Sequence, residues 1–97
     1  MIESYNPTEL TELLNRLPHW RYDAERKALH RRLECGDFSE AMEIMMRIAI
    51  DAERADHHPE WCNVYNRIDI WLTTHDAAGV SSRDEALATR IDAIVGS

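Results

Sequence analysis

The chain has 97 residues, and its 18 acidic against 11 basic side chains leave a formal net charge of −7 at neutral pH. Binding to DNA or RNA needs clustered lysines and arginines that neutralise phosphates, so this balance argues against a nucleic-acid partner. With 44% hydrophobic and 30% charged residues, the composition is that of one globular domain over residues 1–97 and not of a disordered chain.

The two cysteines, Cys35 and Cys62, are far apart and form no metal-binding or redox pair motif. Residues 1–4 (MIES) do not resemble a signal peptide, and no apolar run approaches the ~20 residues of a membrane span. We therefore expect a cytoplasmic protein with two reduced thiols and no membrane partner.

The first predicted element is a helix that begins at Asn6 and ends before Pro18. Asn6 is a capping residue, Pro7 suits the first helical position, and Glu9 completes a capping box. Leucines then recur on one face at helical spacing, at positions Leu10, Leu13, Leu14 and Leu17.

Residues 20–35 predict a β-hairpin with its turn at residues 23–26. Trp20 and Tyr22 share one side of the first strand, and in the second strand Leu29 and Leu33 alternate with polar residues, the period expected of a strand with one buried face. Arg31 falls on the apolar side and does not fit this pattern.

The longest predicted helix begins at Asp37, which forms a capping box with Glu40, and Pro59 prevents it from extending far beyond His57. Its apolar stripe consists of Phe38, Ala41, Met42, Met45, Ile48, Ala49 and Ala52. The methionine cluster is compatible with an adaptable binding surface, but packing against a sheet is the interpretation that we prefer.

A second hairpin is predicted over residues 61–73, with a turn at Asn66–Arg67 because asparagine tolerates the left-handed region. Cys62 and Val64 alternate with Trp61, Asn63 and Tyr65 in its first strand. Its second strand is the clearest in the chain, with Ile68, Ile70 and Leu72 at alternate positions.

The last predicted element is a helix that begins with a capping box of Ser81 and Asp84 and ends at Gly96. The order is therefore helix, strand, strand, helix, strand, strand, helix. An antiparallel sheet of four strands has one face that needs cover, and three amphipathic helices can supply it. The sequence predicts an α+β fold with three helices packed on one face of a four-stranded antiparallel sheet.

The stretch from Glu53 to Asp84 holds three of the five histidines. His57 and His58 come where the long helix ends, and His75 comes where the clearest strand ends. Side chains at the ends of rigid elements can meet in a loop-lined cleft, and imidazoles give and take protons near neutral pH.

Several carboxylates accompany these histidines. Glu53 lies one helical turn before His57 and can face the same way. Side chains that could orient an imidazole or set its protonation are Asp56, Asp76 and Asp84. Asp84 is equally well explained as the capping-box residue alone, and a histidine at a helix end often just favours the helix dipole.

Two further alternatives concern the same stretch. Trp61 and Tyr65 could stack on a flat ring, but cross-strand packing explains them equally well. Three histidines could bind zinc, although His57 and His58 are adjacent and tend to diverge in extended backbone. We therefore expect no metal.

Four segments in this stretch resemble the signature of the pterin-4a-carbinolamine dehydratases. They are Asp56-His57-His58-Pro59-Glu60-Trp61, Asn63-Val64-Tyr65-Asn66, Leu72-Thr73-Thr74-His75 and Gly79-Val80-Ser81-x-x-Asp84. The resemblance extends to Trp20 and to Asp37-Phe38, and so covers most of the chain beyond Pro18.

The resemblance implies dehydration of 4a-hydroxytetrahydropterin to quinonoid dihydropterin, without a metal or organic cofactor, in recycling of the pterin used by aromatic amino acid hydroxylases. It implies that His57, His58 and His75 are the active-site histidines, with His57 and His75 transferring protons and His58 binding substrate. It further implies that the pterin pocket includes the side chains of Glu53, Asp56, Trp61 and Asp84.

The resemblance also implies a homodimer or homotetramer. A second class of function follows from it, because some animal members bind a transcription factor as coactivators. In that alternative the partner would contact the Met42 and Met46 side of the long helix. An intact histidine set favours the enzyme, because an adaptor has no need for it.

Overall fold

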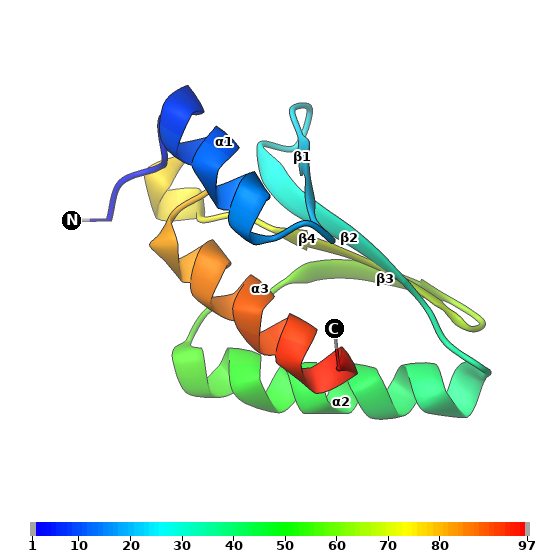
Figure 1. Ribbon diagram of the computed structural model, residues 1–97. Helices are drawn as coiled ribbons and strands as arrows, with labels where there is room; N and C mark the ends of the chain where they lie inside the picture. The colour runs from blue at the N-terminus through cyan, green and yellow to red at the C-terminus, as the bar shows by residue number, and fades with distance from the viewer. Residues whose placement is uncertain (1, 97) are drawn as a thin grey trace.

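The computed structural model describes residues 2–96. Its elements are α1 (Pro7–Arg16), β1 (Arg21–Asp23), β2 (Ala28–Glu34), α2 (Phe38–Ala55), β3 (Glu60–Val64), β4 (Arg67–Leu72), a 3₁₀ turn η1 (His75–Ala77) and α3 (Ser82–Val95). The strands form one antiparallel sheet in the order β1-β2-β4-β3, and the helices cover one of its faces (Figure 1). The predicted fold class and element order are confirmed.

The core is built on β4, which occupies a central position in the sheet. Ile68, Ile70 and Leu72 alternate along it and are fully buried beneath the helices. The helices and β2 contribute the other large buried side chains, which include Leu13, Leu29, Leu33, Ile48, Leu87 and Ile91. Each such side chain contributes about 1.5–3 kcal/mol by leaving water. Within residues 2–96 no helix is both long and apolar enough to cross a membrane.

The predicted helix caps account for where the helices begin. Asn6 and Glu9 form the reciprocal capping box of α1, and Ser81 and Asp84 form that of α3. Asp37 caps α2 by accepting from the amide of Glu40. The Glu40 carboxylate, however, accepts from the amide of Gly36 at 3.0 Å and not from that of Asp37, so the box predicted for α2 is only half formed.

Arg31, which did not fit the strand pattern, lies on the helix-covered side of β2. Its guanidinium pairs with the carboxylate of Asp92 on α3, and the same carboxylate accepts from the indole Nε1 of Trp20 at 2.9 Å. A charge between sheet and helix requires a partner, and Asp92 supplies it. The arginine thus joins the two layers instead of weakening the strand.

The side chains of the edge segments differ from the predicted pattern. In β3 it is Trp61 that packs against the core, while Cys62 and Val64 are exposed. Trp20 is buried just before β1, whereas Tyr22 within it is 36% exposed. Phe38, predicted in the stripe of α2, is 48% exposed. The exposed side chains among them lie in the edge strands β1 and β3 or at the start of α2, where fewer neighbours cover a side chain.

The second hairpin turns one residue earlier than predicted. Tyr65 adopts the left-handed conformation with φ 51°, and Arg67 already belongs to β4. Asn66 instead joins the hairpin to the end of β2. Its side-chain amide donates to the carbonyl of Cys35 at 2.9 Å, and the Cys35 amide donates back to the carbonyl of Asn66 at 2.8 Å.

Both cysteines are free thiols, Cys35 buried and Cys62 exposed. Burial, together with the charges of Glu40 and Asp37, raises the pKa of the Cys35 thiol. This thiol is therefore protonated at neutral pH and behaves as a small apolar core residue.

The segment before α1 is held against α3. The amide of Tyr5 donates to the carbonyl of Val80, and its hydroxyl donates to Glu85 at 2.7 Å. Arg16 donates to both oxygens of the same carboxylate at 3.1 Å. Burial and the bond to Glu85 raise the pKa of Tyr5 to about 12, so the phenol remains a donor at physiological pH.

The face of the sheet away from the helices carries a charged cluster around Asp69. One oxygen of Asp69 accepts from Nε2 of His30 and from Nε of Arg32, each at 2.9 Å, and Arg67 lies 3.7 Å from the other oxygen. Burial of Asp69 opposes its ionisation. The bonds and charges of Arg32 and His30 outweigh that effect and lower the pKa of Asp69.

We predict that Asp69→Asn lowers the free energy of unfolding by about 1.5–3 kcal/mol at pH 7, the range for hydrogen bonds to charged groups. Because the folded-state pKa is depressed, this stabilisation is complete above the unfolded value of ~3.9 and disappears as pH falls through the folded value. Urea unfolding at several pH values measures it. A difference that stayed constant from pH 7 to pH 2 would contradict the assignment, and Glu43→Gln, in an exposed helical pair, is the control.

Candidate functional site

His57 is placed by the way in which α2 ends. Asp56 adopts the left-handed conformation with φ 51° and caps the helix. The amide of His57 donates back to the carbonyl of Ala52 at 3.1 Å, which is the closing bond of a Schellman-type helix end. The imidazole is therefore fixed by a defined turn and not by a flexible linker.

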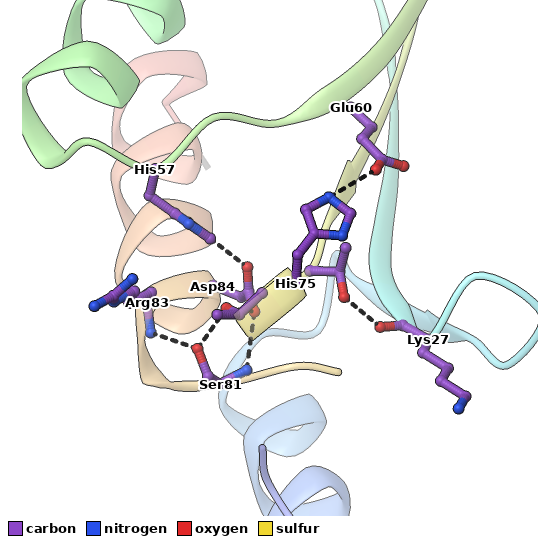
Figure 2. A network of polar contacts seen from close by, with 9 residues as sticks. Lys27, His57, Glu60, His75, Ser81, Arg83 and Asp84 are labelled. Carbon is purple, nitrogen blue, oxygen red and sulfur yellow. Dashed lines mark hydrogen bonds and ion pairs between the residues drawn. The ribbon is translucent and has the colours of Figure 1, made fainter. Parts of the chain in front are cut away.

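The carboxylate of Asp84 holds the His57 ring in place. Nε2 of His57 lies 2.6 Å from Oδ1 of Asp84, and the side chain of Asp84 is fully buried (Figure 2). Nδ1 of His57 makes no hydrogen bond to any of residues 2–96. An acceptor at Nε2 selects the tautomer with its proton there, so Nδ1 can accept a proton, or donate one after protonation.

The second oxygen of Asp84 is held by donors from two other segments. Oδ2 accepts from the hydroxyl of Thr74 at 2.8 Å and from the amide of Ser81 at 2.9 Å. The Ser81 and Thr74 hydroxyls are 2.6 Å apart, and the amide of Arg83 donates to Ser81. Since Thr74 gives its proton to Asp84, Ser81 must donate to Thr74. The polar atoms around this buried carboxylate are thus satisfied.

Asp84 was open to two interpretations from the sequence, helix cap or pocket residue. The structure shows Asp84 in the helix cap and also in contact with a histidine of the cleft, because Oδ2 closes the capping box of α3 while Oδ1 bonds His57. The two uses do not compete, since each engages a different oxygen.

His58 and Glu53 form a second pair, at 2.7 Å. From the sequence, Glu53 could face the same way as His57, but the left-handed turn at Asp56 directs His57 toward α3 and leaves Glu53 beside His58. This pair is open to solvent, with the Glu53 side chain 80% exposed.

His75 belongs to the turn η1, which follows β4. Its Nε2 lies 3.4 Å from an oxygen of Glu60, at the start of β3 (Figure 2), and its side chain is 83% exposed. Each of the three histidines therefore has a carboxylate facing Nε2. These carboxylates range from the fully buried one of Asp84 to the exposed one of Glu53.

The three histidines share one cleft of about 400 Å³. Its lining consists of Asp56, His57, His58, Pro59, Glu60, Thr73, Thr74, His75, Asp76 and Arg83. The ends of α2 and β4 and the start of α3 thus meet there, as the sequence predicted for side chains at element ends.

The other expected pocket residues take different positions. Asp56 lines the cleft with the histidines, and Asp84 lies behind His57. Glu53 and Trp61 instead line a neighbouring hollow of about 660 Å³, which meets the cleft at His58 and Pro59. Tyr65, considered for stacking, is 63% exposed in the hairpin turn and is not among the residues that line the cleft.

Sequence reasoning missed four residues of this site. Thr74 and Ser81 hold Asp84, Glu60 faces His75, and Arg83 lines the cleft. Ser81 was assigned to the cap alone. Arg83 and Glu60 adjoin singled-out residues, Asp84 and Trp61, but their contacts depend on tertiary structure that spacing does not reveal.

The cleft is equipped for proton transfer. It gathers three imidazoles, two carboxylate side chains besides Glu60 and one guanidinium around a volume that suits a small polar ring. Within residues 2–96 no group of three or more histidine, cysteine or acidic side chains is placed to hold a metal ion.

One known protein family matches nearly the whole chain. A family model described as pterin 4 alpha carbinolamine dehydratase matches residues 3–94. The chain belongs to the pterin-4a-carbinolamine dehydratase family. The match covers every described helix and strand except the last residue of α3, and so includes the whole cleft.

Members of the dehydratase family from several bacteria are similar along nearly their full length. A protein from Rhizorhabdus wittichii, provisionally named pterin-4-alpha-carbinolamine dehydratase, is 50% identical over 93 residues, which are 96% of each chain. One from Burkholderia orbicola with the same provisional name is 51% identical over 92 residues, 95% of this chain and 90% of its own.

A solved structure of the dehydratase fold is also similar. The transcriptional coactivator/pterin dehydratase from Brucella melitensis is 39% identical, with a TM-score of 0.91 over 95% of this chain and 98% of its own. The arrangement of helices on one face of the sheet is therefore that of the family.

We predict that Thr74→Val lowers the free energy of unfolding by about 1–3 kcal/mol, because it removes a donor to a buried carboxylate and leaves the Ser81 hydroxyl without its acceptor. Thermal or urea unfolding measures the loss. Thr89→Val is the matched control, since the Thr89 hydroxyl bonds only a carbonyl of its own helix at an exposed position. Equal stability of the two variants would show that the buried hydroxyl chain is not needed.

Proposed function

We propose that this chain dehydrates 4a-hydroxytetrahydropterin to quinonoid dihydropterin by general acid and base catalysis at the three-histidine cleft. The observation that carries the proposal is the convergence of His57, His58 and His75 on one cleft in a chain of this family. The role that we assign to the reaction is the recycling of the pterin used by an aromatic amino acid hydroxylase.

The chemistry requires one acid and one base. The 4a carbon carries a hydroxyl group beside a ring nitrogen that bears a proton. An acid protonates the hydroxyl, the C–O bond breaks with its electron pair on oxygen, and water leaves. A base removes the proton from nitrogen, and the N–H electron pair becomes the second bond between nitrogen and carbon. Each proton transfer assisted by a placed side chain contributes roughly 10²–10⁴-fold.

We assign the two proton transfers to His57 and His75. His57 is the most rigidly held of the three, with Nε2 bonded to buried Asp84 and Nδ1 left without a partner among residues 2–96. His75 approaches the cleft from η1, a different element, so the two imidazoles can serve separate atoms of one substrate. Asp84 supports a positive charge on His57 while the proton is held there.

Substrate binding falls to the remaining polar residues. His58, paired with Glu53, lies between the cleft and the neighbouring hollow, and Asp56 lines the cleft itself. Trp61 walls the hollow, where its ring offers a flat apolar surface to part of a bound pterin. The reaction as proposed requires neither a metal nor an organic cofactor.

We predict that the purified chain accelerates dehydration of enzymatically generated 4a-hydroxytetrahydropterin, and that His75→Ala lowers this activity at least about tenfold, because one proton-transfer group is lost. Spectroscopic assay of the dehydration measures both rates. A wild-type rate no greater than the spontaneous one would overturn the proposal. His19→Ala, which removes an exposed histidine outside the cleft, is the matched control.

A chelator tests the metal-free mechanism separately. Activity that the chelator abolishes and zinc restores would contradict that mechanism.

A second candidate function, protein binding, is favoured by one face of α2. Met46 is 63% exposed and Ile50 is 50% exposed on this helix, while the similar Brucella melitensis protein is described as a transcriptional coactivator as well as a pterin dehydratase. We propose that this face carries the self-association of a homodimer or homotetramer, and that any protein partner would bind there too.

We predict that Met46→Glu reduces the size of the assembly, because it places a charge on an apolar contact surface, while the dehydratase rate per chain changes less than twofold. Analytical ultracentrifugation over a range of concentrations measures the assembly. Thr11→Glu on an exposed turn of α1 is the control. An unchanged sedimentation coefficient would remove this face of α2 from the interface.

A further inference from the structure

His57 and His75 receive very different support from the fold. The partner of His57 is a buried carboxylate held by further hydrogen bonds. The partner of His75 is Glu60 at 3.4 Å, and the His75 side chain is 83% exposed. If His75 transfers protons, its ring orientation has to be set by contacts at the surface.

Glu60 reaches His75 from the helix-free face of the sheet. It is the first residue of β3 and pairs in register with Trp71 of β4. Its Oε2 faces Nε2 of His75, and its Oε1 lies 3.7 Å from Nη1 of Arg26. The carboxylate therefore lies between the histidine and an arginine, with a different oxygen turned to each.

Arg26 is itself held in place by the aromatic ring of Trp71. The guanidinium carbon lies 3.7 Å from the centroid of that ring, within the range of a cation–π contact. The indole Nε1 of Trp71 donates to Asp23 at 3.1 Å, and the other oxygen of Asp23 accepts from the amides of Glu25 and Arg26. These amides and the indole lower the pKa of Asp23 against the effect of its burial. The β1–β2 turn is therefore organised by hydrogen bonds to the Asp23 carboxylate.

The same turn is bound to the segment that carries His75. The hydroxyl of Thr73, two residues before His75, donates to the carbonyl of Lys27 at 2.8 Å. The β1–β2 turn is thus attached to Trp71 of β4 and again to Thr73, which directly follows that strand. Arg26 is therefore presented to Glu60 by a turn that is hydrogen-bonded at both Asp23 and Lys27.

We propose that Glu60 is a positioning residue for His75, and that Arg26, stacked on Trp71, fixes the Glu60 carboxylate for that purpose. A carboxylate beside Nε2 fixes the orientation and tautomer of an imidazole, which leaves Nδ1 of His75 for the substrate. The proposal rests on the dehydratase function and extends it to three residues of the helix-free face, Arg26, Glu60 and Trp71.

The expected effect is modest because the pair is exposed. Surface ion pairs contribute at most about 1 kcal/mol, which corresponds to about fivefold in a rate. Glu60→Gln should therefore lower kcat about fivefold and change KM less than twofold. Glu60→Asp should recover part of the loss, and Arg26→Ala should lower kcat in the same direction by a smaller factor.

A double-mutant cycle separates positioning from direct contact, since Glu60 also lines the cleft. If Glu60 acts through His75, Glu60→Gln causes no further loss in the His75→Ala background. Additive losses, a rise in KM at constant kcat, or an unchanged rate for Glu60→Gln would each overturn the proposal. Glu34→Gln, which removes a carboxylate from the same face opposite Arg67, is the matched control and should match wild type.

A measurement independent of activity keeps the test apart from that of the dehydratase function. In NMR spectra of the imidazole groups, Glu60→Gln and Arg26→Ala should shift the signals of His75 and leave those of His57 unchanged. If the wild-type chain fails to dehydrate the pterin, the proposed function is wrong. These spectra then still test whether Glu60 contacts and orients His75. Unmoved His75 signals in Glu60→Gln, with folding verified by circular dichroism, would refute the positioning role.

Discussion

The burial of one carboxylate, that of Asp84, is the constraint on which this site depends. A carboxylate without solvent access must have its oxygens satisfied by hydrogen-bond donors. Here they come from the end of α2 (His57), the end of β4 (Thr74) and the start of α3 (Ser81). The interaction that starts the last helix therefore also joins three separate segments. The hydrogen bonds that join these segments are therefore also the ones that position the imidazole of His57.

The cleft draws on both sides of the sheet. His57 is held from the helix-covered side, where burial makes each polar contact strong and its loss costly. His75 is approached from the helix-free face, where Trp71 and the β1–β2 turn carry Arg26 and Glu60. A histidine held through buried bonds and one held through exposed contacts can line the same cleft because β4 ends beside α3.

Within residues 2–96 no layer of helices covers the other face of the sheet, and charged side chains pair across its strands. Arg32 faces Asp69 in the register of β2 and β4, and Glu34 faces Arg67. Opposite charges at directly paired positions stabilise a sheet, and the exposed apolar side chains of Cys62 and Val64 on this face are confined to the edge strand β3. The exposed apolar side chains of α2 lie instead on the helical layer, and one of them, Ile50, also lines the hollow that contains Trp61.

Much of the fold could be predicted from the sequence because the decisive patterns are local. The period-two alternation of Ile68, Ile70 and Leu72 identifies β4, and the boxes at Asn6 and Ser81 identify helix starts, since these interactions span only a few residues. The three histidines that line the cleft were found similarly, because His57, His58 and His75 stand at element ends within a recognisable signature. These features needed no knowledge of distant contacts.

Tertiary structure alone decided the pairings. Glu53 turns to His58 because Asp56 adopts a left-handed conformation, and Arg31 fits its strand because Asp92 of α3 lies opposite it. The contacts of Thr74 with Asp84 and of Glu60 with His75 join residues 10 and 15 positions apart in the sequence. By itself, then, the sequence determined which elements form and that His57, His58 and His75 stand at their ends. Which carboxylate serves which histidine depends on how the elements pack, and spacing along the chain does not encode it.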